Sequence, residues 1–467
     1  MSEGLPSLKA LARSHPELEI VTDGELLSER GHDWWMRSLI RRRIGDLQRP
    51  AAVLRPRSTA DVCTALAWAQ QTGTPIVPYG LGSGVCGAIL PTSDQVVLDL
   101  GAMNAMLALD ERSLTVSVQA GMRGSDFEEA LQARGYTMGN FPQSIALSTV
   151  GGWCATRAAG QLSTLYGNIE DMLLGCEVVL AGGRAIRLTP NPRSSIGPDL
   201  RELFLGSEGT LGVFTELTFR IHPRAEASRG RAFSLPTVDA GIEALRVAMR
   251  EGWKPAVARV YDATEAGRNF QAASDGKAVL LVMSEGPAAL VDVESRAVRA
   301  IVEAAGGEDL GEEPVRSWLE HRNRVPSFES LLEQGLVADT IEVAIAWDKL
   351  PTLFADVVTA GSRIEGMIAV SGHISHCYTQ GANIYFTFVG AHSDLDAALA
   401  LYDSAWETTM AVTHELGGTI AHHHGIGRVR KGWLKKELGA AYEVLVGIKR
   451  ALDPDGILNP GVLVDVE

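Results

Sequence analysis

The sequence is poor in cysteine and has none of the arrangements in which cysteines usually bind metal or build a disulfide framework. Its 467 residues include five cysteines, an odd number, and no two of them form a Cys-x-x-Cys pair. This pattern argues against a disulfide-bonded fold and against a zinc site built on thiolates. We therefore expect reduced thiols in a cytoplasmic protein.

Positive charge and long hydrophobic runs are also scarce. The 42 Lys and Arg residues are outnumbered by 57 Asp and Glu residues, which gives a net charge of −15. Nucleic acids bind to basic surfaces, so no nucleic-acid partner is expected. No stretch approaches the roughly 20 apolar residues that cross a membrane, and the N-terminus lacks the apolar core of a secretory signal. We expect no transmembrane segment.

Residues 1–50 are polar and are expected to be irregular. They contain a run of arginines at Arg37, Arg41, Arg42 and Arg43. Two interpretations of this run stay open: the solvated face of a helix, which is the usual role of such a run, or a peripheral contact with anionic lipid.

From residue 56 onward, helical and strand patterns alternate. Ser58 and Asp61 predict a capping box for a helix that Gly73 ends, and Ser125 with Glu128 predicts a second capping box for a helix closing near residue 135. Strands are expected at 76–80, 96–100, 114–118 and 216–221, with a hairpin that turns at 182–183.

Residues 224–410 have fewer glycine clusters than the segments on either side. Helical patterns at 238–251 and 288–305 alternate there with strand patterns at 278–283 and 384–389. These features suggest a separate domain that carries substrate contacts. The remainder, 411–467, returns to glycine-rich turns.

Glycine is abundant, at 49 residues, and three clusters of small residues stand beside predicted strands. The first, PYGLGSGVCGA at 78–88, suits either a pyrophosphate cradle or a structural turn, because glycine lets backbone N–H groups approach an anion. The second, at 142–173, is rich in hydroxyl groups, and the third is GSEGTLGVFTE at 206–216. Together the three clusters suit one extended ligand.

These three segments, in this order, resemble the FAD-binding domain of the vanillyl-alcohol oxidase and p-cresol methylhydroxylase superfamily, and the resemblance extends over about residues 50–463. It implies FAD as the cofactor. The pyrophosphate would lie on Pro78, Gly80, Leu81, Gly82, Ser83 and Gly84. The isoalloxazine and ribityl groups would lie on Ser144, Ser148, Thr149, Gly151, Gly152 and Thr156. The adenine side would be held by Glu208, Gly209, Thr210 and Val213.

The resemblance also implies the fold and the way in which the cofactor is held. We expect an α+β fold with an N-terminal segment and two-subdomain FAD-binding domain at 1–223, a substrate (cap) domain with an antiparallel sheet and helices at 224–410, and a C-terminal segment that returns to the flavin at 411–467. Some members attach the flavin covalently through a His in the first loop. Ser83 stands there in this chain, so we expect non-covalent FAD.

Candidate reactive groups are concentrated near the C-terminus. Tyr385 lies in a strand-like ANIYFTF segment, and His422, His423 and His424 precede a glycine. On an extended chain, His422 and His424 would point one way and His423 the other. Imidazoles can shuttle protons near neutral pH.

A metal is the rival use of these imidazoles, together with those of His373 and His376. Their spacing matches no zinc motif. Related flavin dehydrogenases of D-2-hydroxy acids that carry a metal have Glu-His-Gly at this turn and a His at the position of Tyr385, whereas this chain has His423 and Tyr385 instead. We therefore predict no metal.

The HHHGIGRVRKGW segment, the tyrosine strand and YGNIED most resemble the alkylglycerone-phosphate synthase family. By this resemblance Tyr385 would be the acid/base phenol, the three histidines would manage protons and phosphate, and Arg259 would match a family arginine near the flavin. His373 takes the place of an arginine that contacts substrate in that family. A histidine lacks the bidentate, permanently charged fork of arginine.

Two activities follow as expectations. The first is an FAD-dependent oxidoreductase acting on a hydroxyl-bearing or similarly activated carbon. The alternative is an alkylglycerone-phosphate synthase of ether-lipid formation, which exchanges the acyl group of acyl-dihydroxyacetone phosphate for a fatty alcohol through a flavin N5 adduct without net redox. A flavin-storing scaffold is disfavoured, because Tyr385 and the histidines would then have no use. We expect a homodimer with a small-molecule or lipid-like substrate.

Overall fold

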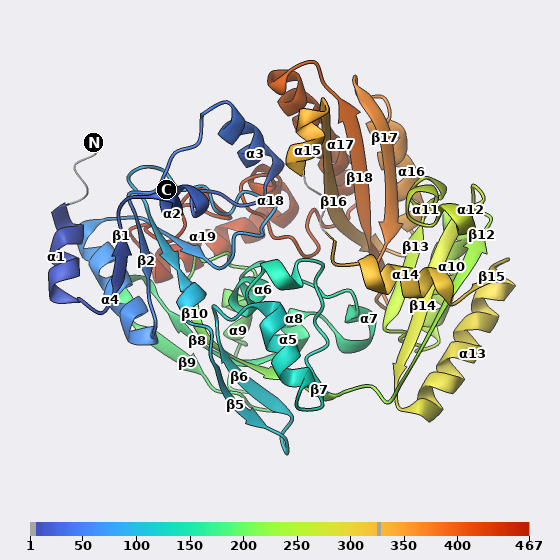
Figure 1. Cartoon of the computed structure of the whole chain (residues 1–467), viewed down its shortest axis with the longest axis horizontal. Coiled ribbons are helices and arrows are strands. Elements are labelled where there is room, and N and C mark those ends of the chain that lie inside the picture. Colours follow the sequence, from blue (N-terminus) through green and yellow to red (C-terminus); the bar gives the residue numbers. More distant parts are fainter. Residues whose placement is uncertain (1–5, 325–327, 467) are drawn as a thin grey trace.

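A four-stranded sheet carries the first glycine loop. The computed structural model describes residues 6–324 and 328–466 (Figure 1). In the sheet, β2 (Ala52–Arg55), β4 (Val96–Asp99) and β3 (Ile76–Tyr79) run parallel, and β1 (Glu19–Val21) is the antiparallel edge. Parallel neighbours need a crossover, which α4 (Thr59–Thr72) supplies between β2 and β3. The predicted capping box of Ser58 and Asp61 and the left-handed stop at Gly73 are confirmed.

A five-stranded antiparallel sheet carries the other two loops of small residues. Its order is β5 (Met106–Asp110), β6 (Thr115–Gln119), β10 (Val213–Arg220), β8 (Leu173–Val179) and β9 (Ala185–Leu188). The hairpin expected at 182–183 joins β8 to β9. The helices between β6 and β8 are α5 (Gly124–Gln132), α6 (Val150–Thr156), α7 (Ser163–Tyr166) and α8 (Ile169–Met172). Shorter elements beside this sheet are β7 (Tyr136–Thr137), α9 (Arg201–Phe204) and β11 (His222–Pro223).

A seven-stranded sheet, antiparallel at every pairing, fills the other half of the molecule (Figure 1). Its strands, in spatial order, are β15 (Glu308–Gly311), β12 (Ala227–Leu235), β14 (Ala278–Gly286), β13 (Val257–Tyr261), β17 (Met367–Ile374), β18 (Gly381–Ala391) and β16 (Leu336–Ala346). The helices within and after it are α10 (Val238–Arg250), α11 (Ala263–Asn269), α12 (Gln271–Ser274), α13 (Ala288–Ala304), α14 (Glu313–His321), α15 (Phe328–Glu333), α16 (Leu350–Gly361) and α17 (Leu395–Glu415).

The two faces of the seven-stranded sheet belong to two different cores. Phe233 and Val260 pack in one core with residues of α10, α16 and α17, whereas the adjacent Ala232 and Tyr261 pack in another core with residues of α5, α6 and α14. Neighbouring residues of a strand point to opposite faces, so the second set faces the glycine loops. This alternation directs one face of the sheet toward the cofactor domain.

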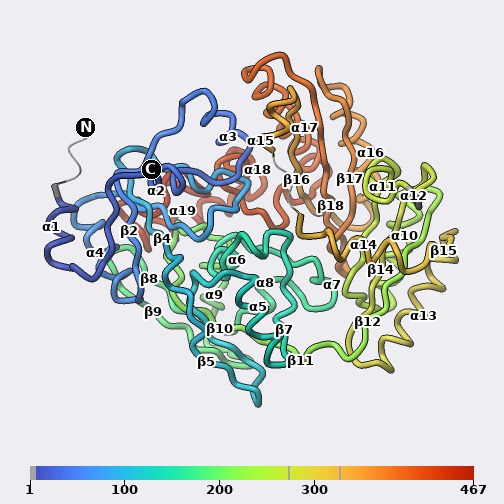
Figure 2. Tube along the Cα trace, in the orientation of Figure 1, coloured from blue at the N-terminus to red at the C-terminus, as the bar shows by residue number. Residues whose placement is uncertain are grey.

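The C-terminal segment returns from the seven-stranded sheet to the four-stranded sheet. It contains α18 (Lys431–Leu438) and α19 (Tyr442–Leu452), and Leu458 pairs with Ile76 as a parallel bridge. In Figure 2 its red tube lies beside the blue N-terminal tube. The expected α+β class and antiparallel cap sheet are confirmed, while the domain boundaries at 223 and 410 stay predictions. No helix within the described ranges is both long and apolar enough to cross a bilayer.

The expectation of an irregular N-terminus is wrong. Residues 6–43 form α1 (Pro6–Ser14), β1, α2 (Glu25–Glu29) and α3 (Met36–Arg43). The arginine run belongs to α3, whose buried face includes Ile40. On its exposed side, Arg37 pairs with Asp403 and Arg43 with Glu333, at 2.6 and 2.8 Å. These carboxylates favour the interpretation of the run as a solvated helix face.

The second predicted capping box is also wrong. The N-cap of α5 is Arg123, which makes no side-chain cap, and Ser125 donates to the neighbouring Asp126 instead. The buried Glu128 carboxylate accepts hydrogen bonds from the Thr137 hydroxyl (2.6 Å) and the Met138 N–H (3.2 Å). A buried carboxylate must satisfy its oxygens, and these inward partners do so in place of the helix end.

Gly427 provides a test of how the C-terminal segment docks. Its φ is +54°, and a Cβ there would lie 2.0 Å from the Cys86 carbonyl oxygen in the first glycine loop. We expect Gly427→Ala to lower the free energy of unfolding by about 3 kcal/mol, since overpacking alone costs about 1–3 kcal/mol. Gly432→Ala in α18, where a Cβ meets nothing within 4 Å, should raise it by up to about 1 kcal/mol. Equal urea midpoints for the two variants would contradict this docking.

Candidate active site

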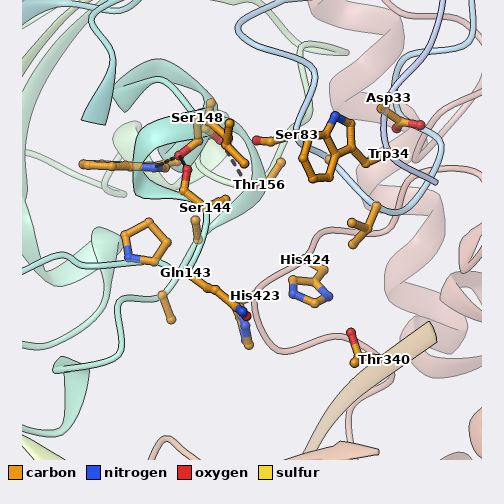
Figure 3. Close-up of a pocket in the computed structure, with 18 of the residues that line it drawn as sticks. Asp33, Trp34, Ser83, Gln143, Ser144, Ser148, Thr156, Thr340, His423 and His424 are labelled. Atoms are coloured by element: carbon orange, nitrogen blue, oxygen red, sulfur yellow. Dashed lines mark hydrogen bonds between the residues drawn. The ribbon is translucent and has the colours of Figure 1, made fainter. Parts of the chain in front are cut away.

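A cavity of about 820 Å³ lies between the glycine loops and the inner face of the seven-stranded sheet. Every residue expected to hold FAD lines it except Thr210, which is fully buried with its hydroxyl donating to the Ser207 carbonyl. Figure 3 shows the small hydroxyl side chains Ser144, Ser148 and Thr156 across the cavity from His423 and His424. The cavity therefore joins the predicted cofactor loops to most of the predicted reactive groups.

The first glycine loop packs too closely against its neighbours for side chains to fit. A Cβ on Gly80 would lie 2.6 Å from the Thr149 hydroxyl oxygen, and a Cβ on Gly82 would lie 2.5 Å from that of Tyr79. At these two positions the wall of the cavity is consequently formed by backbone. Backbone N–H groups suit a pyrophosphate, so the loop fits FAD.

The second loop presents hydroxyl groups in fixed positions. Thr149 caps α6 by accepting from the Gly152 N–H at 3.1 Å. Ser148 donates to the Ser144 carbonyl and accepts from the Trp153 indole, both at 2.8 Å. These bonds hold the loop in one shape beside the cavity, as a binding wall for a rigid ring system requires.

Glu208 connects the third loop to the C-terminal segment. Its carboxylate accepts from the backbone N–H groups of Ile426 (2.6 Å) and Gly427 (2.9 Å). Burial raises the pKa of Glu208 to about 7, against the lowering effect of these hydrogen bonds. Glu208 lines the cavity, as expected, but its carboxylate holds the chain beside the three histidines.

Four side chains form a row across the inner face of the seven-stranded sheet. Glu342, Tyr385, His373 and Tyr261 are register partners on β16, β18, β17 and β13. Directly opposite residues lie on the same face, so their side chains meet. The His373 ring stacks on Tyr385 at 5.1 Å between centroids and on Tyr261 at 5.0 Å.

The three histidines do not alternate as expected. The phenol oxygen of Tyr385 lies 3.0 Å from His423 Nε2 and 2.6 Å from His424 Nε2, while His422 Nε2 lies 2.6 Å from the hydroxyl of Tyr378. The backbone is bent rather than extended, because the N–H groups of all three residues donate to one oxygen of Glu342, at 3.2, 3.1 and 2.8 Å.

Glu342 also forms an ion pair with Arg430, and both side chains are fully buried. Burial acts to raise the pKa of Glu342, but the charge of Arg430 holds it well below its usual value. Arg430 lies over the ring of Trp406, 4.9 Å from its centroid. Glu342 was not predicted; its signal was an acidic residue, one of two with Asp339, in the otherwise mostly apolar strand VADTIEVAIA.

His373 is held as a neutral imidazole. Its Nδ1 donates to Glu265 at 2.7 Å, and its Nε2 accepts from Arg259 at 2.8 Å. Burial lowers the pKa of His373 despite the nearby carboxylate. His373 and Arg259 therefore meet, which the sequence had not predicted, and Arg259 carries the permanent charge that His373 lacks.

Arg322, which was not predicted, adds a second guanidinium to the same end of the cavity. It lies over Phe141 (5.1 Å) and Trp318 (5.6 Å), and Arg259 also lies over Trp318 (5.3 Å). Burial lowers the pKa of Arg322. Within the described ranges neither arginine has a carboxylate at salt-bridge distance, so neither of these two charges forms an ion pair there.

Among the residues that the structure describes, one group of side chains could hold a metal, next to Tyr385. There His376, His422 and His423 bring one nitrogen each within 4.8 Å of one another. All three imidazoles have lowered pKa values because of burial. No carboxylate joins this group, and the expectation of no metal stays a prediction.

Comparisons with known proteins agree with this geometry. A model of the FAD binding domain matches residues 50–189, and a model of the C-terminal domain of FAD linked oxidases matches residues 224–463. The chain is 32% identical to the Escherichia coli K12 uncharacterized FAD-linked oxidoreductase YgcU, over 96% of both chains. It is 30% identical to the alkyldihydroxyacetonephosphate synthase of Dictyostelium discoideum, over 92% of this chain and 76% of that protein.

Solved structures show the same architecture. An alkyldihydroxyacetonephosphate synthase superposes with a TM-score of 0.83 at 26% identity, covering 97% of this chain and 84% of that one. p-Cresol methylhydroxylase superposes with a TM-score of 0.80 at 16% identity, covering 98% and 97%, a likeness of fold alone.

Glu342→Gln tests whether the buried carboxylate organises the site. The variant leaves the Arg430 charge buried without a partner, so we expect the free energy of unfolding to fall by about 3–5 kcal/mol. Glu333→Gln is the matched control, because Glu333 is 65% exposed in its pair with Arg43. Such a pair contributes about 0–1 kcal/mol. Urea denaturation measures the free energy of unfolding of both variants. An equal decrease in the two would refute the role of Glu342 in organising the site.

Proposed function

We propose that this chain, which belongs to the family of FAD-linked oxidases, oxidises a hydroxyl-bearing carbon of an anionic small molecule. It is a flavoenzyme with FAD as its cofactor, as the glycine loops predicted. We infer non-covalent binding, since Ser83 lines the cavity where other members carry a histidine. The main support for the proposed reaction is the Tyr385 phenol, held by two imidazoles at the cavity wall.

Tyr385 is the proposed acid/base group of the reaction. FAD, when bound, supplies the acceptor for a hydride from the substrate carbon. Burial raises the pKa of Tyr385 above its usual value, so the phenol enters the reaction protonated. Its oxygen accepts the proton of the substrate hydroxyl while its own proton moves to an imidazole. His423 and His424 both lie within reach of this proton. The Nδ1 of His424 also lies 3.3 Å from Glu342, whose charge would stabilise an imidazolium there.

The two arginines that form no ion pair with any described carboxylate indicate the charge of the substrate. Arg259 and Arg322 both line the cavity beside Trp318. A carboxylate or phosphate on the substrate would complete their hydrogen bonding, as arginine forks usually do. Recognition by these groups would orient the hydroxyl-bearing carbon toward Tyr385.

The synthase reaction is the second candidate function. It is supported by the similarity to the two alkyldihydroxyacetonephosphate synthases and by an apolar side of the cavity that suits an alkyl chain. That side includes Phe328, Leu331, Ala338 and Val389. In such an exchange Tyr385 would donate and recover a proton without net oxidation.

Anaerobic mixing of the FAD-loaded protein with hydroxy acids and phosphorylated alcohols tests the first function. We expect one class to bleach the oxidised flavin band, and Tyr385→Phe to slow this bleaching by about 10²–10⁴-fold. Tyr136→Phe, on β7 outside the cavity, is the control and should retain the wild-type rate. Release of fatty acid from acyl-dihydroxyacetone phosphate plus a fatty alcohol, with the flavin left oxidised, would instead establish the synthase reaction.

Arg322→Met tests the proposed anion recognition. Losing one charged hydrogen bond costs about 1.5–3 kcal/mol, so we expect KM for the anionic substrate to rise about 10–150-fold with little change in kcat. Arg316→Gln, in the helix α14 that ends just before Arg322, is the control, because Arg316 is 67% exposed. An unchanged KM in Arg322→Met, or an equal rise in both variants, would show that Arg322 does not bind the substrate anion.

A further inference from the structure

We propose that His423, His422 and Tyr378 form a proton relay that leads from Tyr385, at the cavity, to Asn168 on the other side of the cluster. The proposal rests on the acid/base role given to Tyr385. It explains His422, the one residue of the three that does not line the cavity. A site that needed only a base would be complete with His423 and His424.

The hydrogen bonds of the relay form an unbroken path. The Tyr385 oxygen lies 3.0 Å from His423 Nε2, and His423 Nδ1 lies 2.6 Å from His422 Nδ1. His422 Nε2 lies 2.6 Å from the Tyr378 oxygen, which lies 2.8 and 3.2 Å from the Asn168 amide nitrogen and oxygen. Tyr378 and Asn168 are partly exposed, so the path ends next to solvent.

Each imidazole in the path uses both of its nitrogens, which is the requirement for passing a proton on. A neutral imidazole donates at one nitrogen and accepts at the other. The hydrogen bonds can therefore all run from donor to acceptor toward Tyr385, or all run away from it. In either arrangement both imidazoles are neutral.

The surrounding structure holds the rings in this geometry. Glu342 fixes the backbone of His422 and His423 through their N–H groups. The ring of His376 packs against both, with centroids 5.0 Å from each, and its own Nδ1 lies 2.6 Å from the Ser163 hydroxyl. These contacts leave the rings of His422 and His423 little freedom to rotate away from their hydrogen-bond partners.

The relay moves one proton and no electrons. Tyr385 takes the proton of the substrate hydroxyl as its own proton passes to His423 Nε2. His423 then releases its Nδ1 proton to His422 Nδ1, and His422 releases its Nε2 proton to the Tyr378 oxygen. Tyr378 gives its hydroxyl proton to water beside Asn168. Every relay group is neutral before and after, with its hydrogen-bond direction reversed, and the reverse transfer resets it.

His422→Gln and Tyr378→Phe test the relay by kinetics. A glutamine at 422 can keep a hydrogen bond to Tyr378 but cannot take up a proton at one atom and release it at another. We expect both variants to slow flavin reduction about 10–100-fold, and we expect imidazole buffer to restore the rate in the variants but not to raise it in the wild type. His414→Gln, at the end of α17, is the matched control. Wild-type rates in His422→Gln would overturn the relay.

A second measurement needs no substrate. In the FAD-loaded protein labelled with ¹⁵N-histidine, the bond between the two Nδ1 atoms should give one imidazole N–H proton shifted far downfield and coupled to both nitrogens. Tyr378→Phe should shift this signal, because it removes the partner of His422 Nε2. Zinc found at one equivalent in the purified protein, with the signal appearing only after chelation, would overturn the relay in favour of a metal site.

The two measurements separate this inference from the proposed oxidation. If no hydroxylated compound reduces the flavin, the oxidation fails, while the shared imidazole proton still decides whether the relay is assembled. If the flavin is reduced but the proton signal is absent, the relay fails and the oxidation stands.

Discussion

The buried carboxylate of Glu342 is the constraint on which the arrangement of the site depends. A carboxylate without water must find charge and hydrogen-bond donors within the protein, or it becomes strongly unfavourable. Glu342 takes the Arg430 guanidinium on one oxygen and the N–H groups of His422, His423 and His424 on the other. One side chain of the cap sheet thus bends the C-terminal segment and turns two imidazoles toward Tyr385.

A second buried carboxylate holds backbone N–H groups where the two halves of the molecule meet. Glu208 holds the N–H groups of Ile426 and Gly427, so a second buried carboxylate fixes the chain just beyond the histidines. The C-terminal segment is therefore pinned at one end by the sheet and at the other by a cofactor loop. The cofactor wall and the acid/base groups are therefore positioned by shared contacts. Replacing either Glu208 or Glu342 would disturb the positions of both.

Charge is distributed unevenly around the cavity. The carboxylate of Glu342 is neutralised by Arg430. That of Glu265 pairs with Arg268 and accepts a hydrogen bond from the neutral His373, whereas Arg259 and Arg322 have no carboxylate at salt-bridge distance among the described residues. The cavity is consequently positive at one end although the whole chain carries a net charge of −15. Such a local field favours an anionic substrate and keeps imidazoles neutral nearby.

Local patterns in the sequence predicted the glycine loops, the types of reactive side chain and many regular elements, but not the helices of residues 6–43. The Ser58 capping box, the Gly73 stop and the strand that contains Tyr385 follow from short-range rules, and the loops identified the cofactor. Partners that are distant in the chain were decided only by the tertiary structure. Glu128 turned inward rather than capping its helix, the three histidines curled around Glu342, and Arg322 came to lie beside Arg259. A buried charge is satisfied by whichever donors the packed sheets bring to it, and periodicity along the chain carries no information about those donors.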